Sequence, residues 1–203
     1  MLSWREHITA LTFKLNKACF AVRAIKPFMT SRVLKMVYYS YFHSIMSYGI
    51  IFLGSSHLSN NTFRIQKRII RIITNRSKRD SCRQLYKQLQ ILTFPGQYIF
   101  SLLMFVIKYR EFFPSHSDVH DRNTRYNSNL HLPTTNLKLV QKRVLHLGIK
   151  IFNQLSTNIK SFSKDPKHFK IRLKSFLLEH TLYSLDEYYQ VTSKETYPRC
   201  TNL

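Results

Sequence analysis

Apolar residues in the N-terminal part of the chain recur at intervals of three and four residues. At about 100° per residue, one face of a helix collects Ile8, Leu11, Leu15, Ala18, Val22 and Ile25. This spacing predicts an amphipathic helix that ends at Pro27. Thr30 or Ser31 is expected to cap a second helix, rich in aromatic residues, that reaches about Tyr48.

The following segment combines a short apolar run with three further predicted helices. Gly49 and Gly54 bracket the run Ile50–Leu53, which is either a short buried strand or an extended plug. Helices are expected over residues 63–74, 82–89 and 95–110. Ser59 or Asn60 is expected to cap the first of these, and Asp80 or Ser81 the second, while a proline fits the first turn of the third.

The residue composition changes in the C-terminal part of the chain. Residues 112–136 are rich in Ser, Asn, Asp, His and Thr without helical periodicity, which predicts a long loop or linker. A sixth helix is expected over 137–155, and Asp165 and Pro166 are expected to open a seventh as cap and first helical residue. The pattern therefore predicts an all-α protein of about seven helices. Its expected parts are an N-terminal helical domain (1–111), the loop or linker (112–136), a C-terminal helical segment (137–190) and a frayed tail (191–203).

The net charge of the chain limits the classes of partner that are expected to bind it. The 203 residues include 32 Lys and Arg against 10 Asp and Glu, a formal net charge of +22, and Glu6 is the only acid before Asp80. A compact domain with this much like charge repels itself, and a polyanion relieves the repulsion, so RNA or DNA is the expected partner. The 4 glycines are too few for a glycine-rich phosphate loop, and no cofactor or small-molecule substrate is expected.

The predicted helix over residues 63–74 has the clearest functional pattern. Its cations Arg64, Lys67, Arg68 and Arg71 fall within an arc of about 100°, opposite Ile65, Ile69, Ile72 and Ile73. Arg76, Lys78 and Arg79 extend the positive charge beyond the helix end. We expect these seven cations to contact phosphate oxygens, the alternative being a basic face that is merely solvated.

Other candidate sites are weaker. The aromatic run Tyr38–Phe42 is either core or a platform for stacking on bases, and core is the more frequent outcome. His116, His120, Asp118 and Asp121 have a metal-like spacing but lie in the predicted loop, so no metal site is expected. The acidic pair Asp186 and Glu187 is interpreted as a solvated helix end.

The cysteines and the hydrophobic runs bear on localisation. Cys19, Cys82 and Cys200 are odd in number and far apart, which predicts reduced thiols and an intracellular protein, nuclear or cytoplasmic. The longest apolar run, residues 98–107, is shorter than the roughly 20 residues that cross a bilayer, so no transmembrane segment is expected.

Several short motifs together resemble a known family. They are Leu2-Ser3-Trp4, Lys14-Leu15-Asn16-Lys17-Ala18, Ser44-Ile45-Met46-Ser47-Tyr48-Gly49-Ile50-Ile51-Phe52, Phe63-Arg64-Ile65-Gln66-Lys67-Arg68, Arg79-Asp80-Ser81-Cys82-Arg83, Asn129-Leu130-His131-Leu132-Pro133 and Gly148-Ile149-Lys150-Ile151-Phe152-Asn153. Their order and spacing resemble the region after the palm of non-LTR retrotransposon reverse transcriptases of the jockey-like or RTE-like clades. Leu53 departs from the pattern, which usually has Trp there.

The resemblance implies a thumb and downstream helical region without fingers, palm or endonuclease. The catalytic Asp-Asp turn of the palm has no counterpart, because this chain contains no Asp-Asp pair. The implied role is to hold a template–primer duplex or hybrid, beside a palm domain if a full chain exists, without catalysis. Two alternatives stay open: a basic helical module for acidic proteins or membrane surfaces, and an inert transposon remnant.

Overall fold

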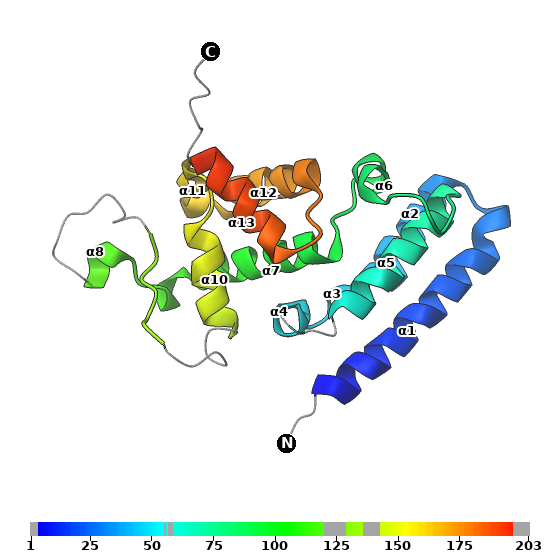
Figure 1. Ribbon diagram of the computed structural model, residues 1–203, viewed down its shortest axis with the longest axis horizontal. Helices are drawn as coiled ribbons and strands as arrows, with labels where there is room; N and C mark the ends of the chain where they lie inside the picture. Colours follow the sequence, from blue (N-terminus) through cyan, green and yellow to red (C-terminus); the bar gives the residue numbers. More distant parts are fainter. Residues whose placement is uncertain (1–3, 55, 57–58, 120–128, 136–142, 197–203) are drawn as a thin grey trace, which may run out of the picture. The chain divides into compact units, whose positions relative to one another are not determined.

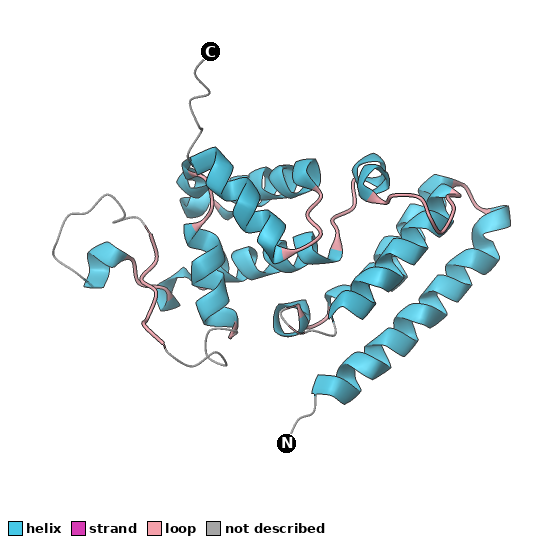
Figure 2. Ribbon diagram, viewed as in Figure 1, coloured by secondary structure: helices cyan, strands magenta, loops and turns pink. Residues whose placement is uncertain are grey.

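The computed structural model describes residues 4–54, 56, 59–119, 129–135 and 143–196 (Figure 1). Regular structure in these residues is helical, and Figure 2 draws no strand among them. An isolated antiparallel bridge joins Ser115 and Leu130. The all-α prediction is confirmed, although the described residues divide into more separate helices than the expected seven.

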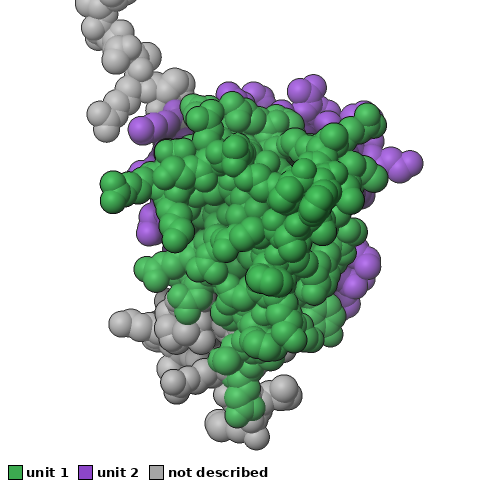
Figure 3. Space-filling view, turned by 90° about the vertical axis from the view of Figure 1, so that its right-hand side faces the viewer, with its two compact units in different colours: residues 1–98 green, residues 99–203 purple. Residues whose placement is uncertain are grey.

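The chain forms two compact units, Met1–Tyr98 and Ile99–Leu203, which we call unit 1 and unit 2 (Figure 3). Helix α7 (Phe94–Lys108) carries the chain from one unit into the other. The boundary thus lies inside a helix, whereas the sequence suggested a division near residue 111.

Unit 1 is organised around two long helices, α1 (Trp4–Ile25) and α5 (Ser59–Thr74), which run side by side in the same direction (Figure 1). The predicted apolar face of α1 is buried at Leu11, Leu15, Ala18 and Val22. Helix α5 begins at Ser59, so the residues proposed as its caps belong to its first turn. Helix α6 (Arg83–Leu89) follows after a short loop, with Cys82 at its N-cap in place of the expected Asp80 or Ser81.

The predicted second helix is one continuous helical segment with a wider turn inside it. It comprises α2 (Ser31–Val37), a π-helical turn (Tyr38–His43) and α3 (Ser44–Ser47). Thr30 is the N-cap residue, although its side chain makes no capping hydrogen bond. The buried residues recur every four positions: Leu34, Tyr38, Phe42 and Met46.

The segment after this helix differs from both sequence interpretations. Ile50–Leu53 is a single helical turn, α4, and neither a strand nor an extended plug. Gly49 has φ 67° and ψ 15°, a left-handed conformation that costs glycine little. A side chain at Gly54 would overlap the buried ring of Tyr98, so this glycine permits close packing of α4 on α7. A run of four apolar residues alone could not reveal these constraints.

A hydrogen-bonded polar group holds the core of unit 1 together. Gln66 of α5 is fully buried, and its Nε2 donates to the hydroxyl of Tyr38 at 3.0 Å and to the carbonyl of Leu92 at 2.9 Å. The hydroxyl of Tyr86 donates to Oε1 of the same amide at 3.1 Å. One side chain therefore joins the π-helical turn, α6 and the segment before α7.

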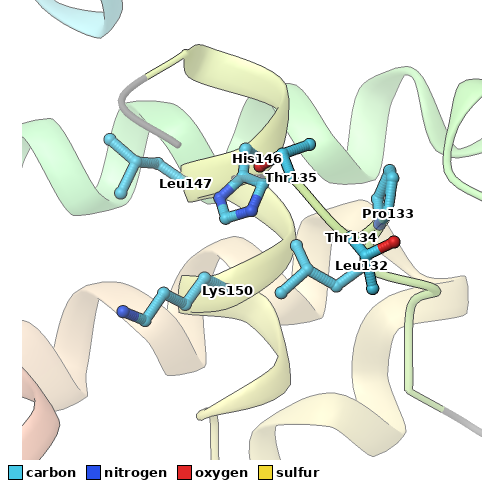
Figure 4. A pocket seen from close by; sticks show the side chains of 7 residues that line it. All are labelled: Leu132, Pro133, Thr134, Thr135, His146, Leu147 and Lys150. Carbon is cyan, nitrogen blue, oxygen red and sulfur yellow. The ribbon is translucent and has the colours of Figure 1, made fainter. Parts of the chain in front are cut away.

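Unit 2 contains five further α-helices among the described residues after α7. They are α8 (His116–Val119), α10 (Val144–Asn153), α11 (Thr157–Lys160), α12 (Pro166–His180) and α13 (Leu185–Thr196). Asn153 clamps Leu130 with two hydrogen bonds of 2.8 Å, and the hydroxyl of Tyr188 donates to the carbonyl of Ile151 at 2.8 Å. Helix α10 and residues 132–135 line an open hollow, to which α10 contributes His146, Leu147 and Lys150 (Figure 4).

Two helices of unit 2 have, at or near their start, an aspartate that accepts hydrogen bonds from the backbone, and the sequence predicted one of these starts but not the other. The Asp165 carboxylate accepts from the backbone amides of Lys167 and His168, which confirms the predicted cap of α12. The predicted loop 112–136 instead contains the short helix α8, where the carboxylate of Asp118 accepts from both the amide and the hydroxyl of Ser115, the residue before the helix. The predicted helix over 137–155 is seen as α10 within the described residues.

The helix predicted to open at Asp165 and Pro166 ends near residue 181, and a separate helix follows it. Thr181 has φ 44° and ends α12. Ser184 and Glu187 then cap α13: the Ser184 hydroxyl accepts from the amide of Glu187, whose carboxylate accepts from the amide of Tyr183. Helix α13 continues to Thr196, so helical structure persists past Gln190, where the sequence predicted fraying.

Candidate nucleic-acid interface

Helix α5 separates a basic face from a buried face along its whole length. The buried residues are Thr62, Phe63, Ile65, Gln66, Ile69, Ile70 and Ile73, a wider face than the four predicted isoleucines. Ile72, predicted to be core, is half-buried. On the opposite side Arg64 and Arg68 are exposed, while Lys67 and Arg71 are half-buried.

Arg68 lies at the seam between α5 and α1. Its Nη1 donates to Oδ1 of Asn16 at 3.0 Å. Nearby, burial raises the pKa of the Cys19 thiol to about 11, and the positive charges of Arg68 and Arg23 oppose that rise. Both guanidinium groups therefore lie close to this thiol, and α1 adds a cation beside those of α5.

Arg71 has a structural role in addition to its charge. Its Nε and Nη2 donate to the carbonyl oxygen of Asp80 at 3.0 and 2.8 Å. This fork spans the loop between α5 and α6 and leaves fewer of its donors for a ligand. The ammonium group of Lys67 lies 4.5 Å from the ring centroid of Phe63 on the same helix.

Backbone hydrogen bonds fix the conformation of the loop after α5. Asn75 is left-handed, and the amide of Arg76 donates to the carbonyl of Arg71 at 3.0 Å, as in a Schellman motif. A turn follows in which the amide of Asp80 donates to the carbonyl of Ser77. The exposed side chains Lys78 and Arg79 occupy the two central positions of this turn.

The 3₁₀-helical turn directly after α1 (Lys26–Phe28) also reaches this loop. The ammonium group of Lys26 donates to Oδ1 of Asn75. We call the cations of this surface the basic band: Arg64, Arg68, Arg76, Lys78 and Arg79, with Arg23 from α1 and Lys26 from the turn directly after α1. The last two were not among the predicted site residues. Only the packing of α1 along α5 brings them to this surface, since they are far from the other cations in sequence.

Unit 1 is much more basic than unit 2. Residues 1–98 contain 16 of the 32 Lys and Arg but only 2 of the 10 acidic residues. Of those two acids, Glu6 lies near the start of α1. The carboxylate of Asp80 accepts from the amide of Ser77 at 3.0 Å and so belongs to the loop. Asp80 therefore lies at the end of the Lys78–Arg79 turn, beside cations of the basic band, and lowers the local positive charge there.

The aromatic run of the π-helical turn divides between core and surface. Tyr38 and Phe42 are fully buried and stacked on each other at 5.4 Å, which supports the core interpretation for these two. Tyr39 and Tyr41 are exposed, and the hydroxyl of Tyr39 donates to the carbonyl of Gln90. Phe13 and Phe20 of α1 are more exposed than either tyrosine.

The structure describes only some of the other candidate residues, namely the possible metal ligands, the cysteines and the acidic pair. His120, Asp121 and Cys200 lie outside the described residues. Cys19 and Cys82 are buried free thiols. In the described part of the chain, no three His, Cys, Asp or Glu side chains gather as metal ligands. Asp186 and Glu187 lie in the first turn of α13, where their negative charge favours the helix dipole.

Among the described residues, no single helix is both long and apolar enough to cross a membrane, whereas α6 and α7, with a bend of 54° between them, meet the length and composition criteria as a pair.

Comparison of the chain with protein-family models, with curated proteins and with solved structures gives no match.

Proposed function

We propose that this chain binds the phosphate backbone of RNA or DNA without sequence preference, through the basic band of unit 1. The observation that carries the proposal is the exposed cationic face of α5, which has no acidic residue and continues into the Lys78–Arg79 turn, to Arg23 of α1 and to Lys26 directly after α1. In this proposal the chain is the thumb-like, non-catalytic part of a reverse transcriptase, as the sequence motifs suggest.

The spacing of the cations supports a polyanionic ligand. Arg64 and Arg68 are four residues apart on one helix face, a spacing at which like charges destabilise a helix by a few tenths of a kcal/mol. Phosphates that lie between such cations replace this repulsion with attraction, and each neutralised phosphate releases counterions. Guanidinium groups also match phosphate geometry with two parallel donors.

Acidic proteins and anionic membrane surfaces are the competing partners. Both would be attracted by the same net charge. The basic band favours nucleic acid because it follows a rigid helix and a hydrogen-bonded loop, which suits a ligand with regularly spaced charges.

The test is a salt titration of binding with matched variants. We expect a variant with Arg64, Arg68, Lys78 and Arg79 changed to Gln to lower the slope of log K against log salt by up to about 0.9 per lost phosphate contact on duplex DNA. The control changes four exposed cations of α12 to Gln: Lys167, Lys170, Arg172 and Lys174. Both variants lose four charges, so equal losses of affinity and slope would refute the assignment to unit 1.

Catalysis is not part of the proposal. The chain lacks the paired aspartates that hold the metal ions of a polymerase, so the purified protein should not extend a primer with magnesium or manganese. Primer-dependent DNA synthesis by the protein would contradict this expectation.

A further inference from the structure

The outer face of α1 carries exposed aromatic rings where a soluble helix usually carries polar side chains. Phe13 and Phe20 are 60% and 73% exposed, although the opposite face of the same helix is core. They are seven residues apart, so both project from one side of the helix, separated by about 10 Å along its axis. Burial within unit 1 does not account for these two rings.

Cations are interleaved with these rings. Lys17 lies between them in sequence, and its ammonium group is 4.5 Å from the ring centroid of Phe13. Lys14 and Arg23 are exposed on the two flanks of the same face. The rings are thus separated by charge and do not form a continuous apolar patch, which distinguishes this face from a hydrophobic protein interface.

This face adjoins the basic band. Asn16 of α1 accepts the hydrogen bond from Arg68 of α5, and Asn16 lies on the flank of α1 between its buried face and the two phenylalanines. Packed helices lie about 8–10 Å apart, so the rings of α1 are one helix spacing from the cations of α5. A strand whose phosphates follow α5 can therefore turn its bases toward α1.

We propose that Phe13 and Phe20 stack on unpaired bases of a single strand whose phosphates lie on the basic band; the inference rests on the proposed function. Aromatic rings with neighbouring cations are the elements that bind single strands without sequence preference. A duplex keeps the faces of its bases in its own stack, so it offers these rings no surface except at an end. Glu6, exposed on the same side two turns before Phe13, marks where the face becomes unfavourable for phosphates.

The test compares three fluorescein-labelled ligands of equal length by anisotropy: oligo(dT), an abasic strand with phosphates only, and a hairpin duplex. Changing Phe13 and Phe20 together to Ala is expected to weaken oligo(dT) binding at least about tenfold, since each stacked base is worth about 1–3 kcal/mol. Binding of the abasic strand and the duplex should change less than about twofold. Phe112→Ala, a similarly exposed ring (70%) in unit 2, is the control and should leave all three affinities unchanged.

A second variant separates stacking from a loss of structure. Phe13→Trp with Phe20→Trp should restore oligo(dT) binding, and quenching of the new tryptophans should follow oligo(dT) and not the abasic strand. The inference is overturned if the Ala variant binds oligo(dT) like the parent or loses affinity for all three ligands equally. In each case the proposed function still stands if the Gln variant of the basic band loses affinity for all three ligands, and it fails if that variant does not.

Discussion

Arg64 and Arg71 lie on the same face of α5, yet their guanidinium groups meet different surroundings. Arg64 is exposed, whereas Arg71 is half-buried and donates twice to the carbonyl of Asp80. A helical wheel assigns both residues to one basic face because it shows only the angle of each side chain about the helix axis. It does not show which groups from other parts of the chain lie near that side chain. The partner of Arg71 is nine residues away, across a loop whose course the wheel does not contain.

This difference predicts unequal effects of one substitution. Arg71→Gln should lower the free energy of unfolding by about 1–2 kcal/mol, because two hydrogen bonds that fix the loop are lost. Arg64→Gln, which removes the same charge from the same face, should stay within about 0.5 kcal/mol of the parent. Urea unfolding of the two variants measures the difference. Equal stabilities would mean that the fork of Arg71 contributes nothing to the fold.

Gln66 shows how one buried polar residue can determine a core. Its amide satisfies the hydroxyl of Tyr38, the hydroxyl of Tyr86 and the carbonyl of Leu92, and burial holds the pKa of Tyr38 well above its usual range. Gln66 falls on the buried face of α5, and nothing in its sequence neighbourhood distinguishes it from a solvated glutamine. Only the fold brings the two tyrosines to it.

Replacing this amide with an apolar side chain of similar size should be costly. Gln66→Leu leaves the two hydroxyls and the carbonyl without their partner, and each such group costs about 1–3 kcal/mol, so a loss of at least about 2 kcal/mol is expected. Gln88→Leu on the exposed face of α6 is the matched control and should be nearly neutral. Differential scanning calorimetry of both variants checks the prediction; a neutral Gln66→Leu would show that water already satisfies these groups.

At the scale of the element, the four-residue repeat Leu34, Tyr38, Phe42 and Met46 explains the π-helical turn. Four residues of an α-helix turn through 400°, so three such steps would rotate the buried face by about 120°. A wider turn in the middle absorbs this drift, and all four side chains stay buried. The same turn brings Tyr41 to the surface while Phe42 remains inside.

Deleting one residue from this turn should therefore be tolerated. Without Ser40, which is exposed, the buried residues follow one another at intervals of four, three and four, the spacing of an ordinary α-helix. Deleting Arg68 from α5 should instead unfold unit 1, because it rotates Ile69, Ile70 and Ile73 by about 100° away from the core. Circular dichroism and urea unfolding report both outcomes, and loss of structure in the Ser40 deletion would contradict the argument.

Local signals in the sequence predicted the positions of many helices but did not predict where the helical segments are interrupted. The apolar spacing located α1, α5 and α7, and Asp165 with Pro166 located the start of α12. The pairs Ser115–Asp118 and Ser184–Glu187 also have the spacing of helix-capping residues in the sequence, but the first lies in a segment that composition assigned to a loop and the second was not recognised as the start of a separate helix. The end of α12 depends on the left-handed conformation of Thr181, a residue type that rarely adopts it.

The sequence also predicted only part of the candidate site. The sequence identified the cations of α5 and the Lys78–Arg79 turn, because they lie close together along the chain. It did not identify Arg23 and Lys26, or the exposed rings of Phe13 and Phe20, as neighbours of that surface. These residues join it through the packing of α1 along α5, a tertiary contact that periodicity within one helix does not specify.

At the scale of the whole molecule, the charge of +22 should act on stability as well as on the proposed binding. Like charges on a folded surface repel one another more strongly than in the expanded chain, and the repulsion reaches about 30 Å at 0.01 M salt but only about 10 Å at 0.1 M. Half of the cations lie in residues 1–98 with only two acids to offset them, so unit 1 should carry most of this repulsion.

Salt should therefore change the melting temperature in opposite directions with and without nucleic acid. The free protein should melt at a higher temperature as sodium chloride rises from about 10 to 200 mM, because screening weakens the repulsion within the folded state. A saturating oligonucleotide should raise the melting temperature most at about 10 mM salt, since ligand stabilisation follows RT ln(1 + [L]/Kd) and Kd increases with salt. The variant with Arg64, Arg68, Lys78 and Arg79 changed to Gln should show a smaller effect of both kinds, since the proposed function assigns the repulsion and the binding to the same side chains. If the free protein became less stable as salt increased, ion pairs would outweigh repulsion, and the basic band would not be a surface held ready for a polyanion.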